Sequence, residues 1–167
     1  MRLEGDTIVV RPLSAAELPT LLQIYSGTPL YFDALGIKTT DLTLAEVRNQ
    51  WAAVQANPQR YLFGVEVPAV NLLIGVVDIE LHTPAPPIAT LQLLLIWGGF
   101  QRQGYAQEVM ELVEAWLVAH QAIDELQVVA AANDDGVRFW RLRGYTQSGA
   151  VAPTPFRGIH GMVLRRA

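Results

Sequence analysis

The strand–turn–helix–strand unit in the middle of the chain constrains the fold most. Ile88–Trp97 is apolar almost throughout, which is typical of a strand covered on both faces of a sheet. Gly98-Gly-Phe100 closes this strand, Ala106–His120 repeats apolar residues at helical spacing, and Leu126–Ala130 is a second apolar strand. A helix that connects two strands in this way joins them as parallel neighbours. We therefore predict a buried parallel β-α-β core.

The flanking segments predict further strands and helices around this core. Two capping boxes, Ser14-Ala-Ala-Glu17 and Thr43-Leu-Ala-Glu46, satisfy first-turn amides and mark helix starts. Strands are expected at 7–13, 61–67, 72–82, after Tyr145 and at about 160–164. Helices are expected at 18–25, 43–57 and 135–142, and the segment 26–40 connects the first two of them. The chain is broken by Pro84, Pro86 and Pro87. The resulting order, β-α-α-β-β-β-α-β-α-β-β, is an α/β domain with a mixed sheet and helices on both faces.

Length and composition favour one self-supporting domain over residues 1–167. A chain of 167 residues, 51% of them hydrophobic, can bury a core of its own. It has no cysteine, which excludes disulfides, thiolate metal sites and a cysteine nucleophile. The longest unbroken apolar run, Leu93–Trp97, is far shorter than the roughly 20 residues that a membrane helix needs. The first residues carry acids and no apolar signal-peptide core, so we expect a cytoplasmic protein without a membrane partner.

The charge narrows the classes of partner. A formal net charge of −4 argues against nucleic acid and leaves room for a cationic amine. His82, His120 and His160 are too scattered to indicate a metal site, so no metal is expected.

The turn Gln101-Arg-Gln-Gly-Tyr-Ala106 carries the clearest chemical signal. A helix start leaves four backbone amides unpaired and carries roughly half a positive charge. Gly104 has no side chain to keep phosphate oxygens away from these amides, Ala106 is also small, and Arg102 adds a cation. A plain turn is the alternative. A Rossmann dinucleotide site would need Gly-x-Gly-x-x-Gly in the first strand–helix turn, and a P-loop would need Gly-Lys-Ser/Thr. This turn has neither motif, so both kinds of site fit the sequence badly.

This loop, between a long strand and an amphipathic helix, resembles the acetyl-CoA pyrophosphate loop of the GNAT superfamily of N-acetyltransferases, Gln/Arg-x-x-Gly-x-Gly/Ala. Asn133 followed by Phe139-Trp-Arg-Leu-Arg-Gly-Tyr145 is similar to the family's Asn…Phe-Tyr-x-Lys-x-Gly-Phe segment. The predicted element order matches that fold over nearly the whole chain. The resemblance implies a mostly antiparallel central sheet with a β-α-β acyl-CoA-binding core, and acetyl-CoA as the acyl donor.

The resemblance also assigns cofactor-binding residues. The implied diphosphate-binding amides are those of Gln101, Arg102, Gln103, Gly104, Tyr105 and Ala106. The main chain of Leu93, Leu94, Leu95 and Ile96 would pair with the pantetheine arm, and an amide near Leu94 would polarise the thioester carbonyl. Asn133 would lie near the pantetheine or the amine, and Phe139 and Trp140 would flank the cofactor arm. Plain core packing is the alternative for Phe139.

Two departures from the family pattern concern proton transfer. Trp140 occupies the position where the family commonly has a tyrosine that protonates the leaving thiolate, and an indole N–H only donates hydrogen bonds. Many relatives have a glutamate in the strand before the loop, where this chain offers Gln92. Asp78 and Glu80 are the candidate bases, with a solvated strand end as the alternative, and Glu66 is a further candidate.

The acceptor is expected to contact the segments 30–33 and 146–159. Tyr31 and Phe32, with Phe156, would form an aromatic wall, and His160 lies beside this region. Alternatively, these aromatic rings fill the core beneath a loop.

The function predicted on this basis is direct attack of a small-molecule or peptide amine on acetyl-CoA. A non-catalytic acyl-CoA-binding or regulatory domain is the alternative, which Trp140 and Gln92 favour. A toxin-like or ribosome-directed transferase stays open, although few Lys and Arg residues are available for RNA contact. A homodimer is expected by analogy alone.

Overall fold

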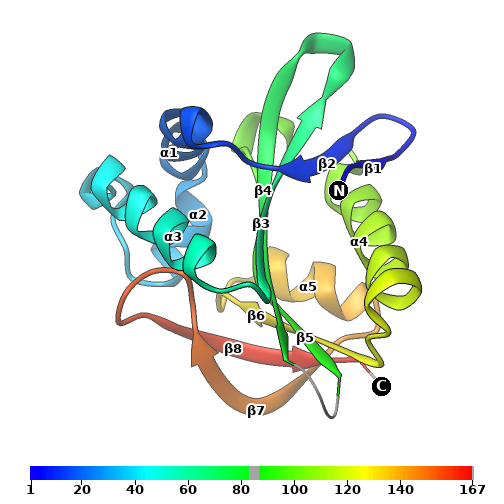
Figure 1. Cartoon of the computed structure of the whole chain (residues 1–167). Helices are drawn as coiled ribbons and strands as arrows, with labels where there is room; N and C mark the ends of the chain where they lie inside the picture. The colour runs from blue at the N-terminus through cyan, green and yellow to red at the C-terminus, as the bar shows by residue number, and fades with distance from the viewer. Residues whose placement is uncertain (83–86, 167) are drawn as a thin grey trace.

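A single eight-stranded sheet forms the centre of the computed structural model, which describes residues 1–82 and 87–166 (Figure 1). Its order is β1-β2-β3-β4-β5-β6-β8-β7. The strands are β1 (Leu3–Glu4), β2 (Val9–Pro12), β3 (Arg60–Val67), β4 (Leu72–His82), β5 (Ile88–Ile96), β6 (Glu125–Ala130), β7 (Thr146–Pro153) and β8 (His160–Arg165). β5 and β6 are parallel, and the other described neighbours are antiparallel. This confirms the predicted mixed, mostly antiparallel sheet.

Helices cover both faces of the sheet, as predicted. In Figure 1, α1, α2 and α3 lie over one face, and α4 and α5 over the other. The helices are α1 (Leu18–Ser26), α2 (Pro29–Ala34), α3 (Leu44–Ala56), α4 (Tyr105–Gln121) and α5 (Asp134–Leu142), with 3-10 turns at Ala15–Glu17, Thr39–Asp41, Pro68–Val70 and Gly98–Phe100. Each layer has its own core, since the apolar side chains of α1–α3 and those of α4–α5 pack on opposite sides of the sheet.

Most predicted boundaries agree with these elements within a few residues. The strand expected at 7–13 is shorter and is preceded by β1, which has two residues and therefore no readable alternation. The Thr43 capping box is present, because Thr43 Oγ1 accepts from the Glu46 amide and the Glu46 carboxylate accepts from the Thr43 amide, both at 3.3 Å. The chain break expected at Pro84 and Pro86 lies outside the described residues.

An extra residue in β5 reverses the alternation of its side chains. The register with β4 shifts between Asp78 and Ile79, so that Gln92 is the additional residue. Before this bulge Leu91 packs in the α4–α5 core, whereas after it Leu93 packs in the α1–α3 core. One inserted residue exchanges the two faces of a strand, because side chains alternate with a period of two. The bulge therefore turns the strand over just before residues 93–96.

Glu108 in α4 anchors the N-terminal hairpin. Its carboxylate accepts hydrogen bonds from the amides of Thr7 (2.8 Å) and Ile8 (3.3 Å) and from the Thr7 hydroxyl. Burial alone would raise the pKa of Glu108, but these hydrogen bonds to the charged form lower it below its usual value. The ionised carboxylate therefore stabilises the folded state.

We expect Glu108→Gln to destabilise the protein by about 1–2 kcal/mol at neutral pH. A lowered folded-state pKa gives stability that is fully present above the unfolded pKa of about 4.3 and is lost as the pH falls through the folded pKa. Urea unfolding at pH 7 and at successively lower pH should therefore show the two proteins converging in acid. Glu111→Gln is the control, because Glu111 lies in the same helix and, among the described residues, accepts a hydrogen bond from exposed Gln107. A difference that does not change with pH would contradict the assignment.

Candidate functional site

The sheet opens between its two parallel strands. β5 pairs with β6 only from Ile88 to Leu91, although β5 continues to Ile96. At the end of β5, the Trp97 amide donates to the Ile74 carbonyl of β4 at 2.7 Å. Since amides alternate in direction along a strand, those of Leu94 and Ile96 face away from β4, toward the gap. The edge predicted to bind a pantetheine arm is thus free of strand pairing.

A cavity of about 650 Å³ passes through this opening. The α2 side contributes Thr28, Leu30 and Tyr31; the strands contribute Leu94, Leu95, Ile96, Val129, Ala130 and Ala131; the α4–α5 side contributes Phe100, Gln101, Arg102, Gly104, Tyr105, Ala106, Gln107, Asn133, Asp135, Gly136, Phe139 and Trp140. Because α2 and α4 cover opposite faces, the cavity joins the two helical layers. The lining residues in and just after β6, Val129, Ala130 and Ala131, are not among the predicted site residues, although the run of small residues Ala130–Ala132 could have indicated them.

Gly104 occupies a backbone conformation that other residues rarely adopt. It caps α4 with φ = +85°, in the left-handed region that favours glycine. A Cβ built at this position meets no other atom within 4 Å, so packing within the protein does not require a glycine. Arg102 in the same loop also has a positive φ, of 61°. Strained loops of this kind concentrate at ligand sites.

The side chains of this loop brace it, and the Gln101 amide donates to the Gly98 carbonyl at 3.4 Å. Gln101 Nε2 donates to the Ile96 carbonyl at 2.8 Å, which ties the loop to the end of β5. Gln103, which is outside the cavity lining, donates to the Gly99 carbonyl at 3.4 Å. Arg102 pairs with Asp135 at 2.7 Å, but both side chains are mostly exposed, so this pair is weak. The Arg102 guanidinium can therefore also bind an anionic group of a ligand.

The α5 residues combine structural roles with a face on the cavity. Asn133 caps the helix, because its Oδ1 accepts from the Gly136 amide at 2.6 Å. Trp140 is 7% exposed, and its ring centroid lies 4.9 Å from that of Phe139 and 5.3 Å from that of Tyr145. The Tyr145 hydroxyl donates to Glu114 and is outside the cavity lining. The Tyr145 hydroxyl is therefore not placed to act as the acid in place of the family's tyrosine, whose position Trp140 occupies.

Asp78 is buried in an ion pair beneath the bulge. Its side chain is fully inaccessible, and its carboxylate accepts from Arg60 at 2.9 and 2.7 Å and from Gln50 Nε2 at 3.1 Å. Its interpretation as a solvated strand end is therefore wrong. Glu80 is half-buried and accepts from Asn57 (3.1 Å) and from the bulge residue Gln92 (3.2 Å). Both carboxylates lie outside the cavity lining.

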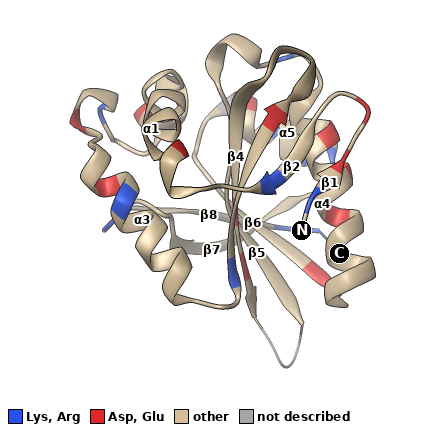
Figure 2. Cartoon of the chain, turned by 45° about the horizontal axis from the view of Figure 1, so that its top comes forward, with Lys and Arg blue, Asp and Glu red and all other residues tan. Residues whose placement is uncertain are grey.

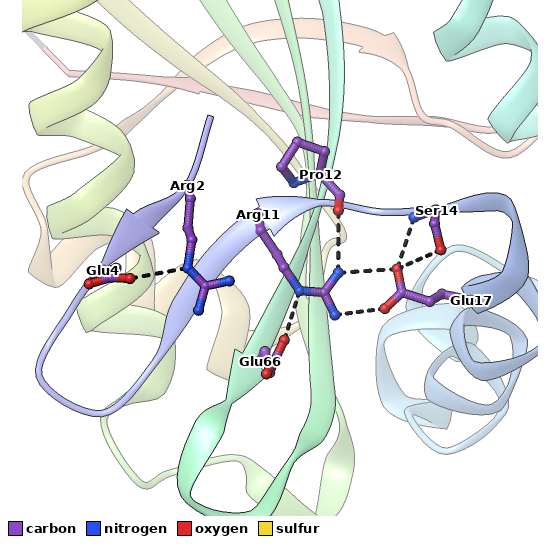
Figure 3. Close-up of polar contacts among 7 residues, drawn as sticks. All are labelled: Arg2, Glu4, Arg11, Pro12, Ser14, Glu17 and Glu66. Atoms are coloured by element: carbon purple, nitrogen blue, oxygen red, sulfur yellow. Dashed lines mark hydrogen bonds and ion pairs between the residues drawn. The ribbon is translucent and has the colours of Figure 1, made fainter.

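Glu66 belongs to a separate ion-pair cluster (Figure 3). Arg11 Nε donates to Glu66 at 2.7 Å, and its guanidinium also bonds both carboxylate oxygens of Glu17, at 2.6 and 3.1 Å. The hydrogen bond from Arg11 lowers the pKa of Glu17 despite partial burial. This cluster links β2 and β3 to the turn before α1, outside the cavity lining. The structure thus gives Glu66 a structural partner and no contact with the site.

The predicted acceptor residues divide into two groups. Tyr31 lines the cavity, whereas Phe32 is fully buried and its ring centroid lies 5.5 Å from that of Tyr25 and 4.9 Å from that of Phe156. The core-filling alternative therefore holds for Phe32. His160 is exposed at the start of β8, paired with Pro153, and lies outside the cavity lining. Of the segment 146–159, residues 146–153 form the edge strand β7, and the rest is a loop.

Within the described part of the chain, no helix is long and apolar enough to cross a membrane. The same residues contain no cluster of three or more His, Asp or Glu side chains that could hold a metal ion.

Comparisons with solved structures agree with this fold. An acetyltransferase from Thermus thermophilus superposes with a TM-score of 0.75 at 22% identity, covering 99% of both chains. A spermidine N-acetyltransferase from Vibrio cholerae, in complex with CoA and spermine, gives 0.73 at 15% identity over 96% of this chain and 94% of its own. An acetyltransferase from Salmonella typhimurium that modifies the N-terminal serine of ribosomal protein L7/L12 gives 0.75 at 13% identity, over 99% and 98%.

No curated protein matches the sequence. The family model described as an acetyltransferase (GNAT) domain matches residues 7–138, most of the chain. The chain therefore belongs to the GNAT family of acetyltransferases.

Proposed function

We propose that this protein transfers an acetyl group from acetyl-CoA to the nitrogen of an amine by direct attack. The observation that carries the proposal is the cavity through the sheet. It connects a helix N-terminus, which attracts phosphate, to an unpaired strand edge and then to the residues Leu30 and Tyr31 on the other helical layer. Two substrates could thus meet inside the sheet from opposite faces.

The residues present fit an acyl-CoA donor. The diphosphate would lie on the amides of the 101–106 loop, where the open space around Gly104 admits phosphate oxygens. The pantetheine arm would extend the sheet along residues 93–96 of β5, with Leu94 and Ile96 presenting their main chains. Phe139 and Trp140 would border the arm on the α5 side. Acetyl-CoA supplies a thioester whose carbonyl carbon is open to attack.

The Leu94 amide is the proposed oxyanion donor. It faces the gap and is held by the pairing of its neighbours with β4, so it need not reorganise during the reaction. Attack by the amine places negative charge on the thioester oxygen, which this amide would stabilise. The loss of one such donor in other enzymes costs about 3–4 kcal/mol of transition-state stabilisation. Positioning and this donor would supply most of the catalysis.

The described cavity lining has neither a tyrosine at the position of the family's usual acid nor a glutamate at the position of its usual base. Trp140 cannot supply a proton, but a thiol has a pKa of about 8.5, so its thiolate is a tolerable leaving group. Water would accept the amine proton and protonate the thiolate. Trp140 and Gln92 also favour a second candidate function, that of an acyl-CoA-binding domain without catalysis.

The proposal predicts transfer to at least one member of a broad panel of primary amines. Each turnover should give one acetylated amine and one free CoA thiol, measured by mass spectrometry and a thiol reagent. We expect a rate at least about tenfold above the protein-free background, since fixing two reactants together can lower the barrier by several kcal/mol. The protein incubated with acetyl-CoA alone should show no added acetyl mass. CoA binding without transfer to any amine would instead support the non-catalytic function.

A further inference from the structure

The α2 side of the cavity, formed by Thr28, Leu30, Tyr31 and Leu95, is called the acceptor wall. The Tyr31 hydroxyl is its unsatisfied polar group. Tyr31 lines the cavity from α2, and its hydroxyl oxygen is buried without a hydrogen-bond partner among the described residues. Burial, together with the nearby Asp78 carboxylate, raises the pKa of Tyr31, so the hydroxyl stays protonated at neutral pH. A buried hydroxyl without a partner is unfavourable, and such groups normally have one. A ligand atom that can accept or donate a hydrogen bond would supply it.

The rest of the acceptor wall is apolar or already bonded. Leu30 and Leu95 are aliphatic, and Thr28 Oγ1 donates to the Ile24 carbonyl at 2.8 Å. The neighbouring Tyr25 hydroxyl is also occupied, because it donates to Gln50 at 2.7 Å. Tyr31 is therefore the available polar contact on this wall among the residues that the structure describes.

No unpaired carboxylate lies on this wall in the described part of the chain. The acid in the described cavity lining is Asp135, which pairs with Arg102 at the opposite, diphosphate-binding end. Asp78 is neutralised by Arg60, and Asp33 of α2 is exposed and outside the lining. Figure 2 shows the acidic residues dispersed over several helices and hairpins. Inside the cavity, an ammonium group would lose water without gaining a counter-ion.

We propose that the acceptor is a weakly basic primary amine carried by an apolar group, whose nitrogen hydrogen-bonds to the Tyr31 hydroxyl. This inference rests on the proposed function and specifies its substrate class. The apolar group would pack against Leu30, and the neutral amine would donate one N–H to the tyrosine oxygen while its lone pair faces the thioester. A polyamine, which carries several positive charges, is a poor fit for this wall.

The fraction of each amine that is neutral at pH 7 supports a preference for weak bases. At pH 7 an alkylamine with a pKa of about 10.4 is neutral in roughly one molecule in 2,500, whereas an amine with a pKa near 8 is neutral in roughly one in ten. A wall without a carboxylate does not compensate for this difference, because burial further disfavours the charged form. The neutral form of the more basic amine is also the stronger nucleophile, which acts in the opposite direction.

The reaction is balanced without another co-reactant. The amine lone pair forms a bond to the acetyl carbon, the carbon–sulfur bond breaks, and sulfur leaves with its electron pair. The amine then loses one proton to solvent, and the thiolate gains one. The products are an N-substituted acetamide and free CoA.

The test compares amines that share an apolar group and differ in basicity, with acetyl-CoA at pH 7. Each aromatic amine is paired with the alkylamine that has one additional methylene between ring and nitrogen, and spermidine represents the polyamines. We expect kcat/KM for the weak base to exceed that of its alkyl counterpart by about tenfold or more. Preferred acetylation of spermidine or of the alkylamines would overturn the inference while leaving the proposed function intact. Absence of transfer to every amine would refute the proposed function itself.

Substitution of the two neighbouring tyrosines tests the assigned hydrogen bond. Tyr31→Phe should lower kcat/KM for the preferred amine roughly 5- to 100-fold without loss of thermal stability, because the removed hydroxyl has no protein partner among the described residues. Tyr25→Phe is the matched control in the same aromatic cluster. It should lower thermal stability, since it leaves the buried Gln50 Oε1 without its donor, and should leave the ratio of kcat/KM values between paired amines unchanged. An unchanged kcat/KM for Tyr31→Phe would overturn the assignment.

Discussion

Gly104→Glu is expected to weaken CoA binding at least about 100-fold, which corresponds to about 2.8 kcal/mol. The side chain would occupy the open space in front of the α4 amides and would place a negative charge where the diphosphate binds. Isothermal titration calorimetry with CoA and acetyl-CoA measures the effect. Acetyl transfer should decrease in parallel, because the donor no longer binds.

Gly149→Glu is the matched control for this change. Gly149 also has a positive φ, of 80°, and open space around its position, but it lies in β7, outside the cavity lining. Both variants therefore introduce the same residue and a similar backbone strain, of about 1–2 kcal/mol. Unchanged CoA affinity in folded Gly104→Glu protein would show that the loop is only a turn. Equal loss of affinity in both variants would attribute the effect to the fold.

Asp78→Ala is expected to destabilise the fold by about 3–5 kcal/mol, the largest effect on stability that we predict. The substitution leaves the mostly buried Arg60 guanidinium without its two hydrogen bonds and leaves Gln50 Nε2 unpaired. Unfolding in urea, monitored by circular dichroism, gives the change in free energy.

A double variant separates the charge from the packing. Asp78→Leu combined with Arg60→Met removes both charges and keeps apolar volume, so it should recover much of the stability lost in Asp78→Ala. Arg2→Met, which breaks the exposed pair with Glu4, should change stability by less than about 1 kcal/mol. A loss below about 1 kcal/mol for Asp78→Ala would mean that the buried pair contributes little.

Local patterns were sufficient to predict the β-α-β core and its loop. Ile88–Trp97 and the helix after Gly104 carry their own hydrophobic period and start signal, so neither depends on distant residues. The family resemblance added the roles of residues 93–96 and 101–106, and the structure places most of them around one cavity. Their roles in binding and catalysis stay predictions until CoA binding is measured.

The features that sequence could not predict depend on pairing between distant segments. Asp78 is buried because Arg60, on the neighbouring strand, and Gln50, on α3, meet it in the fold. Tyr31 and Phe32 are adjacent in sequence and equally aromatic, but the orientation of α2 places only Tyr31 in the cavity lining. The divergence of β5 and β6 likewise has no counterpart in the alternation of either strand alone.

The bulge at Gln92 determines which amides at the end of β5 face β4 and which face the gap. Leu93, Leu94, Leu95 and Ile96 are all aliphatic, so the hydrophobic pattern of this segment does not by itself fix a strand register or exclude a displacement by one position. Because amides alternate in direction along a strand, such a displacement would turn the Leu94 amide toward β4 and the amides of Leu93 and Leu95 toward the gap. Correct threading therefore depends on the polar contact between Gln92 and Glu80 and on the closing Trp97–Ile74 hydrogen bond. A strand paired one position out of register would thus lack the Leu94 amide at the gap, where the proposed reaction requires it.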